Sequence, residues 1–377
     1  MITVRVAMVQ GGADPERDGV ADYTRHLTAA LVESGVDVVP VPFEGLLTTA
    51  RRVRHSTPDV VHVQFAPSAF RFSARPGLLP DLVRAPVVTT LHEYGWWSAA
   101  PWVPDRAWRA VERRRWFDRE TGRLAPRSAA TVTTNAGHAD ALRRRLRRDA
   151  VAVPLAPNVA DHGPVDRDAV RERLGVPLDA RVVAFFGFVH PVKGVRYLVD
   201  AAAALRAQGR PVHVLVLGGF TSLALPEDEA AAFRAELEEH VRERGGHVTI
   251  TGHLPAEDVS AALHASDLAC FPFTAGATTK SGAVLSAFAH GLPAVVTAAD
   301  PPDPRLDDGR TVVVAPRVRD GAALADALAR LLDDPALRER VAAGGAELAA
   351  ERTWPRIAAA HRRLYREVLD RQEVRDV

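Results

Sequence analysis

Short apolar runs alternate with amphipathic helical stretches along the whole of the 377-residue chain. In the first half the apolar runs are rich in valine and almost continuous, which is typical of parallel strands buried on both faces. This alternation predicts an α/β fold built on a doubly wound parallel sheet. The predicted strands cover residues 4–9, 36–41, 60–63, 87–91 and 130–133, and the predicted helices cover residues 23–34, 46–54, 107–124 and 136–147.

A second series of strands and helices follows residues 158–164, where Gly163 and Pro164 indicate a linker. The sequence therefore predicts two doubly wound, Rossmann-like domains that face each other across a cleft. We expect an N-terminal domain over residues 1–163, a C-terminal domain over residues 164–352, and a final helix over residues 353–377 that crosses back to the first domain. In the second series, strands are predicted at 182–186, 212–217, 247–251, 268–271 and 294–297, and helices at 195–208, 227–244, 259–265, 282–290, 322–332, 335–351 and 355–369.

The composition is that of an ordinary globular protein, with 47% hydrophobic and 25% charged residues. A formal net charge of +1 gives the chain no overall attraction to nucleic acid. Cys270 is the single cysteine, which excludes an internal disulfide and favours a reducing compartment. No apolar run is long enough to cross a bilayer, so we expect no transmembrane segment and a cytoplasmic location. Arginine clusters at residues 113–115 and 143–148 fit solvated helix faces, and a weak membrane-surface contact stays open.

Only two lysines occur among the 48 basic residues, and each lies in a loop that contains glycine. Lys193 lies between a predicted strand and helix, and Lys280 lies directly before a predicted helix. Lysine binds a phosphate oxygen as a point charge, and the N–H groups at a helix start also attract anions. In doubly wound sheets ligands bind beyond the carboxyl ends of strands, so two such loops suit a diphosphate. The alternative is that coding bias removed most lysines and left these two in ordinary turns.

Two further patterns bear on metals and helix starts. Thr279 or Ser281 is suited to cap the helix that begins near Gly282. Residues 166–168 spell Asp-Arg-Asp, the letters of a metal-binding Asp-x-Asp motif, but they fit the start of the helix over residues 169–174 better. No group of His, Cys and Asp has metal-ligand spacing in the sequence, so no metal site is predicted.

Several segments, in order, resemble the GT-B glycosyltransferases of family 4. The loop from Gly187 to Pro191-Val192-Lys193-Gly194 resembles the phosphate-binding loop of that family. Residues 286–296 resemble its signature helix and the strand that follows, and residues 19–27 resemble its N-terminal glycine loop and first helix. Shorter matches at Val61-His62-Val63-Gln64, Thr90-Leu91-His92-Glu93, Pro157-Asn158, Thr251-Gly252-His253-Leu254, Ala265-Ser266-Asp267 and Thr353-Trp354-Pro355 extend the resemblance over nearly the whole chain.

The resemblance implies a retaining, metal-independent hexosyltransferase without a cofactor. It would move a sugar from a nucleotide diphosphate donor, of UDP or GDP type, to a small-molecule or lipid-linked acceptor. The N-terminal domain would bind the acceptor, the C-terminal domain would bind the nucleotide sugar, and closure would bring them together. In this resemblance the catalytic residues would be His92 and Lys193, and the acceptor would contact Glu93, Tyr94 and Trp96. The donor diphosphate would contact Gly12, Gly19, Lys193, Lys280, Ser281 and Gly282. The donor sugar and nucleoside would contact Thr278, Thr279, Ser286, His253 and Leu254.

Some of these assignments have structural alternatives. His92 could be a structural histidine at a strand end, and the tryptophans after it could be core residues. Two glutamates separated by seven residues are usual in the family, but Thr278 and Ser286 occupy those positions here. The ribose contact is then weakened or made by Ser286, and Phe188 replaces a usual arginine, for which Lys280 could compensate. Two other functions therefore stay open: a pseudo-glycosyltransferase that couples a nucleotide-linked cyclitol to an amine, and a catalytically silent nucleotide-sugar-binding protein.

Overall fold

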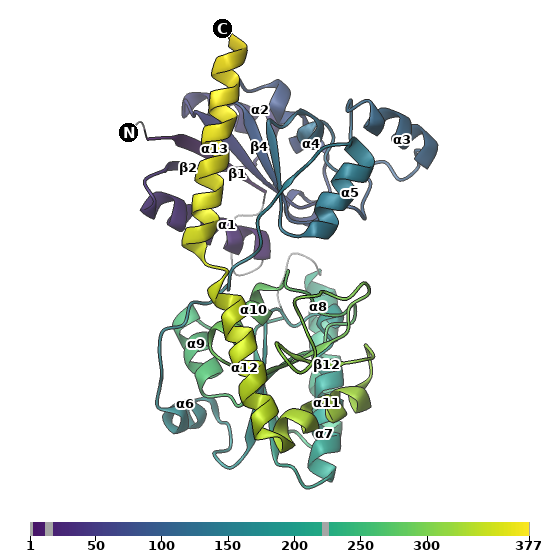
Figure 1. Ribbon diagram of the computed structural model, residues 1–377. Coiled ribbons are helices and arrows are strands. Elements are labelled where there is room, and N and C mark those ends of the chain that lie inside the picture. The colour runs from purple at the N-terminus through teal and green to yellow at the C-terminus, as the bar shows by residue number, and fades with distance from the viewer. Residues whose placement is uncertain (1–2, 12–17, 221–225, 377) are drawn as a thin grey trace. The chain divides into compact units, whose positions relative to one another are not determined.

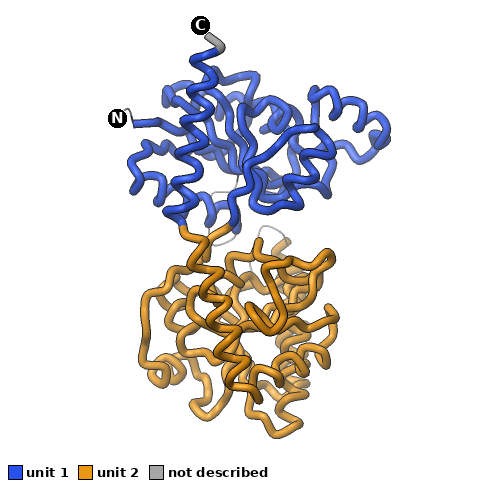
Figure 2. The backbone as a smooth tube through the Cα atoms, viewed as in Figure 1, with its two compact units in different colours: residues 1–154, 354–377 blue, residues 155–353 orange. Residues whose placement is uncertain are grey.

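A computed structural model describes residues 3–11, 18–220 and 226–376 of the chain. The chain divides into two compact units, and Figure 2 shows them in different colours. Unit 1 consists of Met1–Pro154 and Trp354–Val377, and unit 2 consists of Leu155–Thr353. The division falls earlier than the boundary expected at residue 163, and the last helix is part of unit 1.

Unit 1 is built on a parallel six-stranded sheet with the order β2-β1-β3-β4-β5-β6. Its central strand β3 is buried along its whole length, which explains its continuous apolar run. Helix α13 packs against α1 in the same unit. The strands are β1 (Arg5–Gln10), β2 (Asp37–Pro42), β3 (Val60–Phe65), β4 (Val87–Leu91), β5 (Ala130–Thr133) and β6 (Val151–Ala152); the helices are α1 (Gly19–Glu33), α2 (Leu46–His55), η1 (Ser68–Phe70), η2 (Arg75–Asp81), α3 (Asp105–Arg113), α4 (Leu124–Arg127), α5 (Ala136–Leu146) and α13 (Trp354–Asp376).

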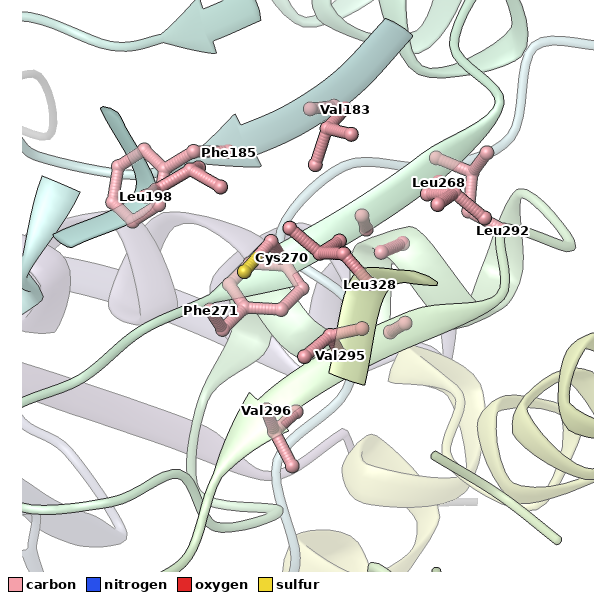
Figure 3. Close-up of a cluster of buried hydrophobic side chains, with 14 of the residues drawn as sticks. Val183, Phe185, Leu198, Leu268, Cys270, Phe271, Leu292, Val295, Val296 and Leu328 are labelled. Atoms are coloured by element: carbon pink, nitrogen blue, oxygen red, sulfur yellow. The ribbon is translucent and has the colours of Figure 1, made fainter. Parts of the chain in front are cut away.

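Unit 2 has a second parallel six-stranded sheet, with the order β12-β11-β10-β7-β8-β9. Phe185, Cys270 and Phe271 are fully buried in its core, and Figure 3 shows them with aliphatic side chains from neighbouring elements. The strands are β7 (Arg181–Phe186), β8 (Val212–Leu217), β9 (Val248–Ile250), β10 (Leu268–Phe271), β11 (Ala294–Thr297) and β12 (Val313–Ala315); the helices are α6 (Arg167–Leu174), η3 (Pro191–Lys193), α7 (Val195–Ala207), α8 (Glu227–Glu243), α9 (Ala256–His264), α10 (Gly282–Ala289), α11 (Gly321–Asp333) and α12 (Pro335–Ala350).

The strand order of unit 2 reverses between β7 and β10. The chain proceeds outward from β7 through β8 to β9, and then returns to β10 on the other side of β7. The loops that follow β7 and β10 therefore leave the same edge of the sheet side by side. A doubly wound sheet binds its ligands at such a switch point. The fold prediction of two doubly wound Rossmann-like units is confirmed.

The structure differs from the predicted elements in a few places. The helix predicted over residues 107–124 is wrong, because α3 ends at Arg113 and Arg115 has a positive φ of 55°. Beyond that point the buried Asp118 accepts hydrogen bonds from the backbone N–H groups of Glu120 and Thr121, which form a turn instead. Strands β6 and β12 were not predicted, since they have only two and three residues. Among the described residues, no helix is both long and apolar enough to cross a bilayer.

Candidate functional site

The loops that follow β7 and β10 pack tightly against each other at the switch point of unit 2. Thr274 donates a backbone hydrogen bond to the carbonyl oxygen of Val192, at 2.9 Å. Gly194 has a positive φ of 70°, and a Cβ at this position would overlap the carbonyl oxygen of Pro272. Glycine is therefore required there by both backbone conformation and space. The two loops form one continuous surface at the carboxyl edge of the sheet.

Lys193 and Lys280 are neighbours on this surface. The ammonium group of Lys193 lies 4.2 Å from the centre of the Phe273 ring, in a cation–π arrangement. Burial and the nearby positive charge of Lys280 lower the pKa of Lys193 to about 8. No carboxylate in the described parts of the chain forms an ion pair with Lys193. The site is therefore electropositive and lacks an internal counter-ion at Lys193, as an anion-binding site requires.

The segment before α10 is held by charged groups within unit 2. Asp303 Oδ2 accepts hydrogen bonds from the backbone N–H and the hydroxyl of Thr279, both at 2.7 Å. Arg352 donates to the carbonyl oxygen of Thr279 at 3.0 Å. Ser281 is the N-cap of α10, since its hydroxyl accepts from the backbone N–H of Val284 at 3.4 Å. Of the two predicted caps, Ser281 is thus the one used, while Thr279 fixes the loop.

Ser286 has a structural environment that differs from the expected contact with the ribose of the nucleotide. Its side chain is completely buried. The hydroxyl donates to the carbonyl oxygen of Gly282 at 2.8 Å and accepts from the backbone N–H of Val159 at 3.0 Å. Ser286 therefore holds the segment that enters unit 2 against α10 and presents no surface to a ligand here. Gly282 serves the same packing, because a Cβ at this position would overlap the side chain of Asn158.

The remaining predicted residues of the nucleotide-sugar site lie on the same edge of the sheet. Thr278 is half-buried, and its hydroxyl accepts from the backbone N–H of Lys280 at 3.3 Å. His253 is exposed and Leu254 is half-buried in the loop that follows β9. This loop is joined to the end of β8 by a bridge between Gly218 and Gly252. The structure therefore places the lysine loops and the Gly252 loop at one edge of unit 2.

In unit 1, His92 follows β4 and is nearly buried, with 7% of its surface exposed. Its Nε2 donates to Oε1 of Gln64 at 2.9 Å, and its ring lies 4.7 Å from the ring of Tyr23. The amide nitrogen of Gln64 lies 3.2 Å from Nε2 of His62, and Nδ1 of His62 lies 2.6 Å from the hydroxyl of Tyr365. A buried hydrogen-bonded series thus fixes the ring of His92 and its tautomer.

The residues predicted to bind the acceptor have different surroundings. Tyr94 is only 3% exposed, and its hydroxyl donates to Asp118 at 2.6 Å. Burial, together with Asp118, raises the pKa of Tyr94 well above its ordinary value. Tyr94 therefore supports its loop from inside. Trp96 is 61% exposed and contacts Phe72, with ring centres 6.3 Å apart, so it is not a core residue. Glu93, which directly precedes Tyr94, is half-buried.

The two predicted glycines of the first loop have different outcomes. Gly12 lies outside the described residues. Gly19 begins α1, where the side chain of Asp18 caps the helix by accepting from the backbone N–H of Val20 at 2.9 Å. Gly19 is exposed, and a Cβ at this position would meet no other atom within 4 Å. Among the described residues, space alone therefore does not require glycine at position 19.

One group of possible metal ligands was not visible in the sequence spacing. Side-chain ligand atoms of Asp161, His264 and His290 lie within 4.8 Å of one another. Nε2 of His264 lies 2.6 Å from Asp161, and Nε2 of His290 lies 2.8 Å from the hydroxyl of Ser260. These atoms are therefore engaged in a hydrogen-bonded network of unit 2. Asp166, from the Asp-Arg-Asp sequence, is the N-cap of α6, as predicted.

Sequence reasoning missed three residues that shape the site: Gln64, Phe273 and Asp303. Gln64 had a visible signal, because His62 and Gln64 are polar residues two apart in a valine-rich strand, and therefore lie on one face. Phe273 and Asp303 had none, since their roles depend on how loops distant in sequence approach Lys193 and Thr279.

Comparisons with known proteins agree with this geometry. Residues 180–334 match the family model described as glycosyl transferases group 1. The chain is 29% identical over 285 residues to the alpha-D-kanosaminyltransferase of Streptomyces kanamyceticus, covering 73% of this chain and 68% of that protein. It is 28% identical over 359 residues to the phosphatidyl-myo-inositol mannosyltransferase of Mycobacterium leprae (strain TN), covering 89% and 84%. The structure of Anabaena HepE in complex with UDP and glucose matches with a TM-score of 0.71 at 16% identity, over 97% of this chain and 100% of that chain.

Residues 180–334 therefore match a group 1 glycosyltransferase domain, and the chain has the GT-B fold of its structural neighbours. Relatives that match most of the chain are named as sugar transferases, which supports an enzyme of this class. The predicted family resemblance and the predicted sugar transfer are confirmed. The stereochemistry, the independence from metal, the acceptor and the roles of single residues stay predictions.

Proposed function

We propose that the protein is a retaining hexosyltransferase whose unit 2 binds a nucleotide diphosphate sugar at the switch point between β7 and β10. The observation that carries this proposal is the pair Lys193 and Lys280 on adjoining loops, with no carboxylate ion pair at Lys193 in the described structure. A diphosphate supplies the negative charge that Lys193 lacks among the described residues. Anabaena HepE, solved in complex with UDP and glucose, supports a donor of the UDP type.

In the proposed reaction the glycosyl–phosphate bond breaks as negative charge develops on the departing nucleoside diphosphate. Lys193 stabilises that charge, and Lys280 and the N-terminus of α10 add to the positive potential. These groups are already held by Phe273 and by the Ser281 cap, so little rearrangement is needed as charge develops. The phosphate itself takes the proton of the acceptor, so no side-chain base is required. Cations of the protein occupy the place that a metal ion has in other transferases, so we propose metal-independent transfer.

In unit 1 we assign His92 to the reacting sugar and the exposed ring of Trp96 to the acceptor. Gln64 holds His92 in one tautomer, with Nε2 as the donor. Phe72 lies next to Trp96 and is 51% exposed, so these rings offer an apolar platform of the kind that sugars stack on. One relative is named a phosphatidyl-myo-inositol mannosyltransferase, which supports a lipid-linked acceptor, and we propose a small-molecule acceptor as the other possibility.

A screen for released nucleoside diphosphate tests the proposal. The protein is incubated with UDP-, GDP- and dTDP-sugars, each with and without candidate acceptors. We expect one nucleotide sugar to raise the melting temperature and to release nucleoside diphosphate faster when an acceptor is present. Binding without release in any combination would instead identify a silent binding protein. Release that EDTA abolishes and Mg²⁺ restores would overturn the metal-independent assignment.

A further inference from the structure

Helix α3 presents a basic face that the sugar-transfer site does not use. Arg106, Arg109 and Arg113 are exposed and are spaced by three and four residues, which places them on one face of the helix. Trp102 precedes the helix and is 82% exposed, and Trp116 follows it and is 65% exposed. In Figure 1, α3 lies at the margin of unit 1, away from the sheet. We call these five residues the α3 face.

The arginines of the α3 face form no ion pair with the acidic residues of their own helix. None of Arg106, Arg109 and Arg113 forms an ion pair within the described parts of the chain. Both acidic residues of α3 are engaged elsewhere, because Asp105 and Glu112 pair with Arg119, at 2.7 and 2.9 Å. Glu112 is only 1% exposed. Glu112 is therefore buried, Asp105 is exposed but paired with Arg119, and the three arginines of the α3 face stay in solvent without an ion-pair partner among the described residues.

The basic surface continues onto the end of α5, which packs against α3. Arg115 donates to the carbonyl oxygens of Leu146 and Arg147 and so ties the end of α3 to the end of α5. Arg144 and Arg147 are exposed in the same region, and neither has an ion-pair partner among the described residues. Unit 1 thus carries at least five exposed arginines without an ion-pair partner among the described residues, together with two exposed tryptophans.

We propose that the α3 face docks unit 1 on the surface of an anionic lipid bilayer. Arginines are attracted to anionic headgroups, and tryptophans at a protein surface partition into the headgroup region, where the ring is apolar and the indole N–H stays wet. A nucleic acid duplex would satisfy the arginines, but its bases are stacked inside the helix and offer no face to the two exposed indoles. The inference does not depend on the identity of the sugar or the nucleotide.

Vesicle sedimentation tests this docking with the full-length protein. Vesicles of pure phosphatidylcholine are compared with vesicles that contain about one third phosphatidylglycerol, at low and high salt. We expect binding only to the anionic vesicles, weakened at least about tenfold by high salt because the contact is electrostatic. The tryptophan emission should shift to shorter wavelength on binding, as Trp102 and Trp116 leave water.

Variants of exposed residues test whether vesicle binding requires the α3 face or only the positive charge of unit 1. Arg106→Ala with Arg113→Ala should weaken binding about tenfold or more, and Trp102→Ala with Trp116→Ala should remove most of the emission shift. Arg51→Ala with Arg54→Ala is the matched control. Both arginines are exposed on α2, so their replacement removes two positive charges from another part of unit 1.

Several outcomes would overturn the proposal. Equal loss in the α2 control, equal binding to both kinds of vesicle, or no binding to either would each do so. Duplex DNA that competes with the anionic vesicles and binds more tightly would assign the face to nucleic acid instead. Release of nucleoside diphosphate from the nucleotide sugar, measured with a water-soluble acceptor, should be unchanged in all these variants, which keeps this test apart from that of the enzymatic activity.

Discussion

The ammonium group of Lys193 lies 4.2 Å from the centre of the Phe273 ring, so a side chain from the loop after β7 rests on one from the loop after β10. This contact holds the positive charge of Lys193 at the switch point. A carboxylate in the place of the ring would neutralise that charge, whereas the ring does not. The ring fixes the position of the amine, while the charge remains available to an anion. The arrangement explains how a half-buried lysine is kept beside a second lysine.

Replacement of Lys193 by alanine should lower kcat/KM by about 10- to 100-fold or more. The reason is that one preformed cation is lost from the developing negative charge of the leaving group. Initial rates with the best nucleotide sugar from the screen give the measurement. Arg196→Ala is a suitable control, since Arg196 is one turn away in α7 and pairs with Glu236. An unchanged rate in Lys193→Ala would remove the leaving-group role from this residue.

The pH dependence follows from the lowered pKa of Lys193, which is about 8 in the free protein. The protonated form is the active one, so kcat/KM should fall as the pH rises through about 8. Lys280→Met removes a repelling charge, so it should raise the pKa of Lys193 and move this limb to higher pH. A limb that stays in place in Lys280→Met would show that Lys193 is not the group that titrates.

The positive charge of Lys193 should destabilise the free protein at neutral pH. The pKa of Lys193 in the folded state lies below the ordinary value of 10.5, so the folded state disfavours the proton. The stability of the free protein therefore rises as the pH increases from about 8 to 10.5. Lys193→Met should raise the melting temperature at pH 7 by a few degrees, on the order of 2–4 °C per kcal/mol. A lower melting temperature than that of the wild type would contradict this.

The sequence was sufficient for the fold and for the loops of the site, because both depend on local patterns. Valine-rich runs and helical periodicity reveal the strands and helices, and Lys193 and Lys280 stand out by residue type alone. The contacts within the site depend on approaches between distant loops. Nothing near Ser286 in sequence indicates that Val159 uses its hydroxyl, and nothing near Tyr94 indicates that Asp118 lies beneath it. Burial could therefore not be inferred for either residue.

Gln64 should act on the reaction through His92. Gln64→Leu removes the acceptor of the Nε2 proton of His92, so the ring loses its fixed orientation and kcat should fall about tenfold or more with little change in KM. Gln64→Glu keeps an acceptor and adds a negative charge, which favours the protonated imidazole. This variant should recover part of the rate with its acid limb moved to higher pH. Equal loss in both variants, without a shifted profile, would assign Gln64 a merely structural role.

Ser286 should contribute to stability rather than to nucleotide binding. In Ser286→Ala the buried N–H of Val159 loses its acceptor, which costs about 1–3 kcal/mol. The midpoint of urea unfolding should fall accordingly, while the KM for the nucleotide sugar stays within about twofold. Ser286→Thr keeps a hydroxyl and serves as the control for its loss. A raised KM with unchanged stability in Ser286→Ala would restore the expected contact with the ribose.

Two glycines of unit 2 separate backbone strain from the close approach of the loops. Gly175 and Gly194 have nearly the same positive φ, 67° and 70°, so alanine adds a similar conformational cost of about 1–2 kcal/mol at each. A Cβ on Gly175 would meet no atom within 4 Å, whereas one on Gly194 would overlap the carbonyl oxygen of Pro272. Gly194→Ala should therefore be the more destabilising and should also raise the KM for the nucleotide sugar, because the loop that carries Lys193 is pushed away from Phe273. Gly175→Ala should leave that KM unchanged. Equal effects of the two substitutions on stability and on KM would show that the packing of the two loops does not position Lys193.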